Sequence, residues 1–173
     1  MIKLLSMAIA LLAGPAFLFA QPTSRGKTAA DTLQHRNDSV ILANVIMPLV
    51  GRATAANEMP DWQTLGQDIS TKYGDSYVDR TVTKAKIYYY YGKNWPLFSK
   101  ALVHFTEAYE DKEDLKLMNK NANMVLQHSQ APDELKAALA WIKHAVDKEP
   151  GNTTYKATYD GLTMKIRTTL PKS

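Results

Sequence analysis

The chain of 173 residues contains no cysteine. This absence excludes a disulfide framework, a lipid-modified amino-terminal cysteine, a cysteine-ligated zinc site and a CxxC redox pair. Histidine is also scarce, and no two of the four histidines lie three or four residues apart, so no local metal-ligand pair is present. We therefore expect a protein that is held together by packing alone and that has no metal and no cofactor.

Local motifs of catalysis are missing as well. The sequence has no Gly-x-Ser-x-Gly turn and no glycine-rich phosphate loop. The acidic run "YEDKED" at 109–114 is typical of a solvated helix junction, where acids are favoured near a helix start. We predict that the protein is not an enzyme; a hydrolase whose site is assembled from distant acidic residues is the alternative that sequence leaves open.

The basic residues are dispersed along the chain rather than clustered. The net charge is +4 and the isoelectric point about 9.1, yet lysines often stand beside acids, as in "EDKEDLK" at 110–116. Nucleic-acid binding needs a basic patch or stripe, so we predict no nucleic-acid partner. The mild positive balance favours acidic partners or anionic surfaces.

The amino-terminal residues resemble a secretory signal peptide. Residues 1–20 have an early lysine, an apolar stretch broken by a glycine and a proline, and a small residue, Ala20, before a polar segment. We predict cleavage after Ala20 and export to the periplasm or the cell exterior, with no membrane span after cleavage; an uncleaved membrane anchor is the alternative. Residues 21–32 are predicted to be a flexible arm, and residues 33–173 a single helical domain.

Helical periodicity dominates the rest of the chain. Apolar residues recur at i, i+4, i+7 and i+11 in four places, and a fifth, weaker stripe lies between residues 114 and 128. The four stripes are Val78, Val82, Ala85 and Tyr89; Phe98, Leu102, Phe105 and Tyr109; Leu135, Leu139, Ile142 and Val146; and Tyr155, Tyr159, Leu162 and Ile166. Strand signals of similar quality are absent after residue 60, so we predict an all-α fold.

Capping residues predict where these helices begin. Helix starts are expected at Asn94, Asp111, Pro132 and Asn152, because a short polar side chain or an early proline suits the unpaired N–H groups there. Helices of similar length with short connections favour antiparallel hairpins.

Two segments before residue 78 are also predicted to be helical. The apolar run "VILANVIMPLV" at 40–50 is predicted to form a buried helix bent at Pro48, with a strand as the alternative. Trp62, Leu65 and Ile69 predict a short helix ending at Gly74.

Two helices carry a pattern that resembles the second helix of a tetratricopeptide repeat. Ala101, Phe105 and Ala108 have the spacing of Ala138, Ile142 and Ala145, with Pro150 following the second set. The two copies lie 37 residues apart, and Glu113 stands where the first copy would have its proline. The resemblance implies a short tetratricopeptide-like solenoid of helix hairpins.

A longer stretch resembles the helical carboxy-terminal region of exported thioredoxin-family proteins. The similarity covers roughly residues 60–168 and is carried by "YG" and "KNW" at 91–95 and by "ALAWIKHAVDKEP" at 138–150. The thioredoxin cysteine pair has no counterpart here. This resemblance implies a non-catalytic interaction module without its redox domain.

The four consecutive tyrosines at 88–91 form part of one helix. Helical geometry places Tyr89 with the Val78 stripe and places Tyr88 and Tyr91 on a second apolar side, so these three are predicted to be structural. Tyr90 falls on the polar stripe and is predicted to be exposed.

The tetratricopeptide resemblance also implies which positions face a partner. They are Arg80, Thr83, Ile87 and Tyr90 in the first helix pair, and Leu117, Lys120, Met124 and Gln127 in the next. From these we select Arg80, Thr83, Tyr90, Lys120 and Gln127 as the candidate partner-binding residues, because tyrosine beside basic residues suits an acidic peptide. The predicted function is a scaffold that binds a protein or peptide partner; a small-ligand or glycan-binding helical protein is the alternative.

Overall fold

The computed structural model describes residues 36–169, and within this range the chain forms helices joined by short connections, without a β-strand. The all-α prediction is therefore confirmed. The predicted signal peptide and flexible arm lie outside the described residues.

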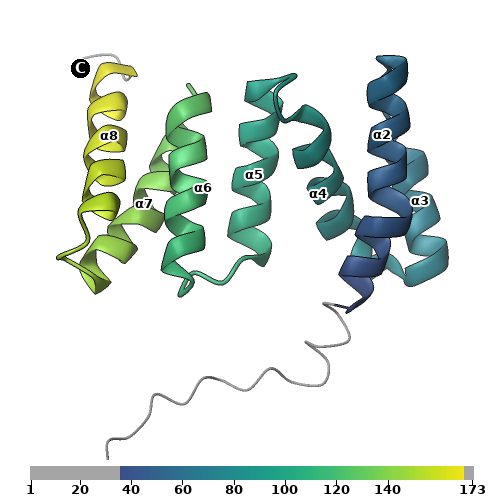
Figure 1. The fold of residues 1–173 in the computed structure, drawn as a ribbon, viewed down its shortest axis with the longest axis horizontal. Helices are drawn as coiled ribbons and strands as arrows, with labels where there is room; N and C mark the ends of the chain where they lie inside the picture. The colour runs from purple at the N-terminus through teal and green to yellow at the C-terminus, as the bar shows by residue number, and fades with distance from the viewer. Residues whose placement is uncertain (1–35, 170–173) are drawn as a thin grey trace, which may run out of the picture.

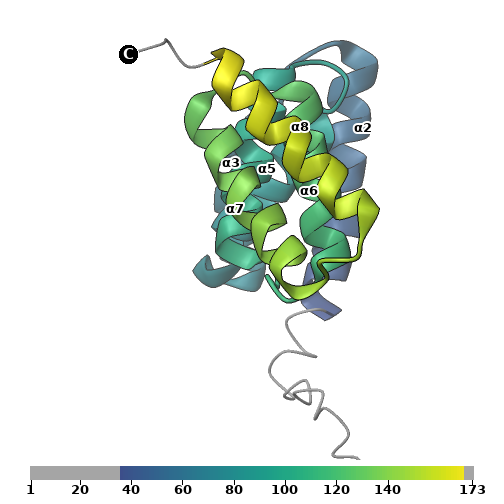
Figure 2. The ribbon, with the colours of Figure 1, turned by 90° about the vertical axis from the view of Figure 1, so that its left-hand side faces the viewer.

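The helices stand side by side in a row (Figure 1). They are α2 (Met47–Ala56), α3 (Trp62–Tyr73), α4 (Val78–Tyr90), α5 (Trp95–Tyr109), α6 (Leu115–His128), α7 (Pro132–Lys148) and α8 (Thr153–Thr169). α2 and α3 lie at one end of the row and α8 at the other, as the view along the row in Figure 2 also shows. The pairs α4–α5, α6–α7 and α7–α8 pack closely as antiparallel hairpins.

The predicted helix at 40–50 is confirmed, but the prediction that it is buried is wrong, because most of its residues are exposed or half-buried. The helix also contains an irregular turn. The stretch from residue 36 to residue 56 is continuously helical, with a π-helical turn at Leu42–Ile46. Pro48 follows in the first turn of α2, where its missing N–H group is tolerated. The wider turn keeps Ile41 and Ile46, five residues apart and both fully buried, on the same face of the helix.

This first helix is unusually apolar. An 18-residue part of the helix Arg36–Ala56 has a mean hydropathy of 1.5, and 17% of that part is buried. By length and composition alone it is the one helix in the described part of the chain that would be able to cross a membrane.

Short polar side chains cap the helices largely as predicted. Asn94 accepts a hydrogen bond from the Leu97 amide at 3.0 Å, and Asn152 accepts one from the Thr154 amide at 3.1 Å. The predicted start at Asp111 is wrong by one turn: Asp111 accepts the Glu113 amide in the preceding loop, and the next acid, Asp114, caps α6. Two acids of equal capping ability three residues apart explain the error.

The core consists of two groups of buried side chains. One joins the first helix to α3 and α4 around Ile41, Ile46 and Ile69, and the other lies among α5, α6, α7 and α8 around Leu135 and Ile142. The half-buried rings of Trp62 and Tyr89 pack against both groups. The four predicted apolar stripes contribute Val82 and Ala85 to the first group and six residues to the second, namely Phe98, Leu102, Leu135, Ile142, Tyr155 and Leu162.

An ion pair joins the first helix to α4. The Arg80 guanidinium lies 3.0 Å from the Asp38 carboxylate, and both side chains are largely buried. Asp38 has no hydrogen bond within the described chain, so Arg80 is its charge partner. Removing one member of a buried pair is costly, which makes this contact important for placing the first helix.

Candidate partner-binding groove

A cavity of about 480 Å³ lies between α4 and α6, above α5. The α4 wall is formed by Lys84, Ile87, Tyr88 and Tyr91, which have the i, i+3, i+4, i+7 spacing of a single helix face. Tyr91 is 59% exposed, and Tyr88 is also exposed. We call this cavity the α4–α6 groove.

The opposite wall and the floor follow the same geometry. Leu117, Lys120, Asn121 and Met124 form the α6 wall with identical spacing. The floor is formed by three apolar residues of α5, namely Phe98, Leu102 and Phe105. The groove is therefore lined by parallel rows of side chains from two helices, with an apolar helix beneath them.

The two ends of the groove differ in chemistry. At one end Tyr91, Trp95 and Phe98 pack edge to face with centroid separations of 5.5–5.6 Å. His128 stacks on Trp95, with ring centroids 3.5 Å apart and planes 9° apart. The other end holds Phe105 and is the more polar one.

The charged side chains of the groove form no ion pair with any other residue in the described part of the chain. The Lys84 ammonium lies over the Phe105 ring at 5.7 Å, and Lys120 is exposed. Within residues 36–169 neither lysine forms an ion pair, and Glu110 is the one acid that lines the groove. Two lysines and one glutamate give the lining a net positive charge.

A buried hydrogen bond holds α6 against α5 beside the groove. The Asn121 side-chain amide donates to the Thr106 hydroxyl at 3.0 Å, and both residues are buried. Such a bond fixes the position of the α6 wall, because a buried amide without a partner would carry a desolvation cost.

The predicted partner-binding residues do not come together. Lys120 lines the groove, and Gln127 is exposed but lies outside its lining. Arg80 is engaged with Asp38 and also lies over the Tyr109 ring at 5.6 Å. Thr83 is buried and lines a different cavity, along α3 and α4. Of the wider set, Ile87, Leu117 and Met124 join Lys120 in the groove.

The predicted exposures of the tyrosines are partly wrong. Tyr90 is only 8% exposed, and its hydroxyl accepts a hydrogen bond from the Trp62 indole at 3.3 Å. Tyr88 and Tyr91, predicted to be structural, are exposed. The reason is tertiary: α3 covers the side of α4 that carries Tyr90, whereas α6 stays away from the side that carries Tyr88. The sequence shows that Lys84, Tyr88 and Tyr91 share one face of the helix. Periodicity alone does not show whether such a face is part of a core or the wall of a groove.

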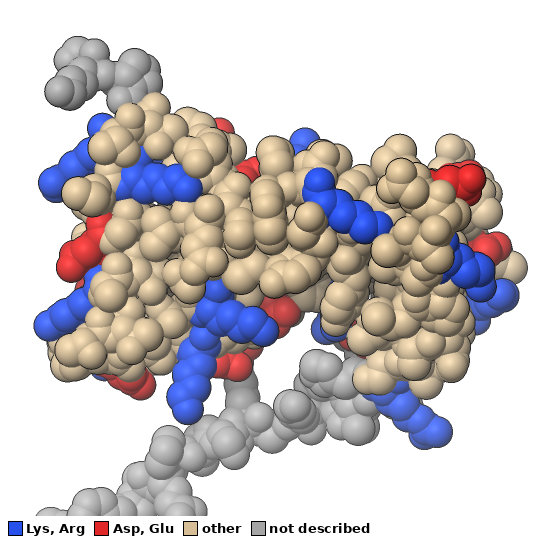
Figure 3. Space-filling model, turned by 45° about the horizontal axis from the view of Figure 1, so that its top comes forward, with Lys and Arg blue, Asp and Glu red and all other residues tan. Residues whose placement is uncertain are grey.

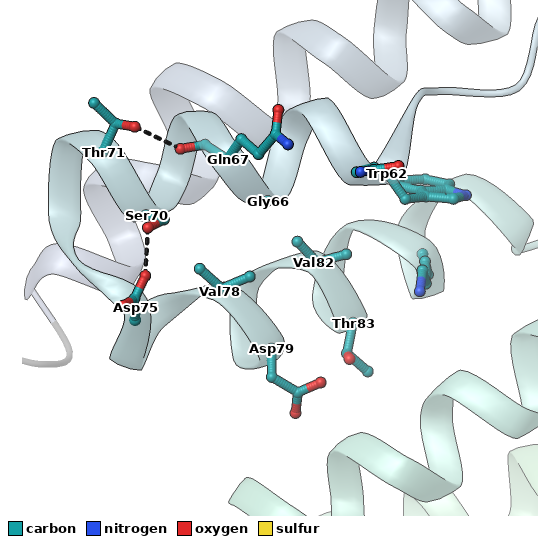
Figure 4. Close-up of a pocket in the computed structure, with 12 residues that line it drawn as sticks. Trp62, Gly66, Gln67, Ser70, Thr71, Asp75, Val78, Asp79, Val82 and Thr83 are labelled. Atoms are coloured by element: carbon teal, nitrogen blue, oxygen red, sulfur yellow. Dashed lines mark hydrogen bonds between the residues drawn. The ribbon is translucent and has the colours of Figure 1, made fainter.

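A second, shallower cavity of about 640 Å³ lies along α3 and α4 (Figure 4). Its base is apolar: Val78 and Val82 point toward Gly66, where an added Cβ atom would lie 3.3 Å from Val78. The rim is polar, with Ser70 donating to Asp75 and Thr71 donating to the Gln67 carbonyl oxygen at 2.9 Å. Trp62 lies at one end.

One titratable cluster lies on the α4–α5 hairpin. The Asp79 carboxylate accepts hydrogen bonds from the Tyr109 hydroxyl and from His104 Nε2, the latter at 2.9 Å. These hydrogen bonds lower the pKa of Asp79 from its ordinary value of 3.8, and the bond from Tyr109 has the largest effect. Burial and the Asp79 carboxylate raise the pKa of Tyr109 to about 12. The described residues place no serine or other activated nucleophile in this cluster.

Other histidines have structural contacts. His144 is half-buried, and its Nε2 atom lies 3.0 Å from the Glu113 carboxylate. Within the described ranges, no three His, Asp or Glu side chains come close enough to hold a metal ion. The face of the molecule shown in Figure 3 carries its lysines, arginines and acids dispersed around apolar and neutral surface.

Comparison with known proteins gives no relative: no protein-family model, curated protein or solved structure matches this chain.

Proposed function

We propose that this chain is a non-catalytic interaction module that binds an extended, acidic segment of a partner protein in the α4–α6 groove. The observation that carries this proposal is the groove itself, which combines exposed tyrosines, an apolar floor and two lysines that form no ion pair within residues 36–169. Tyrosine supplies contact area at a low entropic cost, and a lysine gains a charge-assisted hydrogen bond when a carboxylate reaches it.

The dimensions of the groove suit a short extended segment. From Lys84 to Tyr91 the α4 wall covers seven helical steps, which corresponds to about 10 Å. An extended chain covers this length with about three residues. The expected ligand therefore places an aromatic or aliphatic side chain beside Tyr91 and a carboxylate near Lys84 and Lys120.

The chain's own terminal segments are poor candidates for this occupant. Residues 1–35 contain one acid, Asp31, against Lys3, Arg25 and Lys27, and residues 170–173 contain a lysine and no acid. Their charge matches the groove lysines in sign. An acidic occupant is therefore expected to come from another protein.

The test uses two mixtures of labelled twelve-residue peptides with the same aromatic and leucine content. One mixture carries Asp and Glu, and the other carries Asn and Gln at the same positions. We expect the full chain to bind the acidic mixture about tenfold more tightly in fluorescence anisotropy, and added salt to reduce this difference. Lys120→Glu is expected to remove the preference, whereas Lys156→Glu, which changes an exposed lysine of α8, serves as the matched control.

The outcomes separate the groove from its charge preference. If Tyr91→Ala weakens the binding of both mixtures but the wild-type protein binds the two mixtures equally, the groove is the binding site and the preference for acidic peptides is wrong. Binding that neither Tyr91→Ala nor Lys120→Glu alters would contradict the groove, provided that circular dichroism shows both variants folded.

The repeat and export predictions belong to the same proposal. α6 begins 37 residues after α4, and α7 begins 37 residues after α5, which supports a tetratricopeptide-like arrangement of two hairpins. The signal-like residues 1–20 support export. Cell fractionation with amino-terminal sequencing tests export: a mature chain beginning at Gln21 outside the cytoplasm is expected, and an intact cytoplasmic chain would contradict it.

The polar-rimmed cavity along α3 and α4 favours glycan binding as the second candidate function. Its apolar base and the amide and hydroxyl groups of its rim suit the two faces of a sugar ring. Saturation-transfer NMR with neutral disaccharides tests it. Loss of a signal on Trp62→Ala, with the Lys120→Glu variant unaffected, would support this function over the groove.

A further inference from the structure

The outer face of the first helix is apolar and uncovered. Val40, Ala43, Met47, Gly51 and Ala55 are all exposed and recur every three or four residues along residues 36–56. The side chains of Val40 and Met47 are 38% and 48% exposed. An ordinary core helix would also be apolar, but it would be mostly buried, whereas most residues of this helix are exposed or half-buried.

Gly51 adds a second feature of this face. A Cβ atom added at Gly51 would meet nothing within 4 Å, so the fold of the single chain does not require glycine there. Glycine within a helix costs about 1 kcal/mol relative to alanine. Both the exposed methionine and this glycine indicate that the surface has a role outside the packing of the single chain.

Charge identifies the kind of surface that would cover this face. Arg36 and Arg52 are exposed on the helix. The one acid of residues 36–56, Asp38, is buried and paired with Arg80. Apolar side chains flanked by arginines, with no exposed acid, match the interfacial region of a membrane that contains anionic lipids.

We propose that the outer face of the first helix docks the protein on an anionic lipid surface, with Val40 and Met47 inserted among the acyl chains and Arg36 and Arg52 at the phosphate groups. The helix lies on the membrane and does not cross it. Ile41 and Ile46 are fully buried against α3 and α4, and crossing would remove them from the core. It would also carry the Asp38–Arg80 pair into hydrocarbon.

The absence of cysteine permits a site-specific test in the full chain. Met47→Cys is labelled with a polarity-sensitive fluorophore, and Met164→Cys, which replaces a 70% exposed methionine of α8, is the matched control. The probes are vesicles of phosphatidylcholine alone and of phosphatidylcholine with one quarter phosphatidylglycerol. We expect a blue shift at position 47 with the anionic vesicles and no shift at position 164.

Vesicle flotation of unlabelled variants gives the second measurement. Val40→Glu with Met47→Glu is expected to lower partitioning into anionic vesicles at least about tenfold, because two apolar contacts are lost and two negative charges added. Arg52→Gln is expected to lower it about fivefold, the effect of one basic residue near an anionic surface. Met164→Glu is expected to change nothing.

Each other outcome overturns the proposal. Flotation without a blue shift at position 47 would show that another part of the chain, such as residues 1–20, binds the lipid. A shift at position 47 that depends on protein concentration without vesicles would show that a second copy covers the face. Equal shifts at positions 47 and 164 would indicate non-specific adsorption, and the absence of flotation would exclude membrane binding.

Discussion

Two neighbouring groups of three helices in this protein have the same arrangement, with two helices over a third, but the two upper helices pack against each other in one group and leave a groove in the other. In one, α4 and α6 lie over α5 and leave the groove of about 480 Å³ between them. In the other, α6 and α8 lie over α7 and pack against each other. The comparison shows that the same helix order produces either a closed core or an open groove, depending on the side chains where the two upper helices meet.

Gly161 explains why the second group is closed. A Cβ atom added at Gly161 would lie 2.8 Å from Leu126 Cδ2, so the missing side chain lets α8 approach α6. The positions 37 residues earlier are Tyr89 and Met124, both large. Met124 is a large side chain at the position equivalent to Gly161, and it lines the open groove, whereas Tyr89 packs against Trp62 on another side of α4.

A polar contact completes the closed group. The Lys165 ammonium of α8 donates to the Leu126 carbonyl oxygen at 2.6 Å, near the carboxy-terminal end of α6. A cation at this end is favoured by the helix dipole. Burial lowers the pKa of Lys165, which shows that its charge lies partly out of water.

The largest expected effect separates the cores of the two groups. Leu135→Ala in α7 should lower the free energy of unfolding by about 3–4 kcal/mol, because the side chain is fully buried and leaves a cavity. Leu102→Ala in the groove floor should cost about 2 kcal/mol, since its neighbours already face open space. Urea unfolding measures both, and an equal or reversed order would contradict the comparison.

Forcing the closed group open is the second prediction. Gly161→Leu should destabilise the protein by about 2–3 kcal/mol, because the new side chain overlaps Leu126. Adding Leu126→Ala should restore part of this loss by making room. If the double variant is as unstable as the sum of the single variants, Gly161 does not act through Leu126.

A third prediction compares one pair of equivalent positions directly. Val125→Ala should cost about 2 kcal/mol, because Val125 is fully buried. Tyr88→Ala, 37 residues earlier, should change stability by less than about 0.5 kcal/mol, as expected for an exposed groove wall. Thermal and urea unfolding should agree on the order; a large loss for Tyr88→Ala would mean that the groove is closed in solution.

The smallest effect concerns the acid dependence of the α4–α5 hairpin. Because the pKa of Asp79 is below 3.8, its contribution to stability is present above that pH and is lost as the pH falls below it. Since the pKa of Tyr109 is raised to about 12, the contribution of its hydroxyl group to stability is present below about pH 10 and is lost between about pH 10 and 12.

The wild-type protein should lose stability between about pH 6 and pH 2.5, and Asp79→Asn should make this loss smaller. The difference should be less than about 1 kcal/mol, because Asp79 and His104 are exposed to solvent. Urea midpoints at both pH values measure this. Glu113→Gln, which changes the partner of His144, is the matched control. An identical change in both variants would show that the acid dependence does not come from Asp79.

Local signals in the sequence predicted most of the fold. The stripes containing Phe98, Leu135 and Leu162 are in the core, and Asn94 and Asn152 cap their helices. These features depend on residues within one or two turns of each other. The all-α class follows from them without knowledge of how the helices meet.

The candidate site was predicted less well, because exposure depends on distant segments. Tyr90 is covered by Trp62, which lies 28 residues earlier, and Arg80 is occupied by Asp38 of the first helix. Lys120, one of the candidate partner-binding residues, lines the α4–α6 groove, whereas Tyr91, predicted to be structural, is exposed. Helical periodicity reports which residues share a face, while the neighbour of that face is set by the tertiary fold.

The π-helical turn at Leu42–Ile46 has a consequence for how this chain tolerates changes in length. A π turn holds one residue more than an α turn, so removing Ala43 would leave Ile41 and Ile46 four residues apart and still on one face. Removing Gly51 would instead rotate everything before it by about 100° relative to the rest of the helix. We expect urea unfolding to show a far smaller loss for the first deletion, which makes this turn the place where the helix can lose a residue and keep both of its faces.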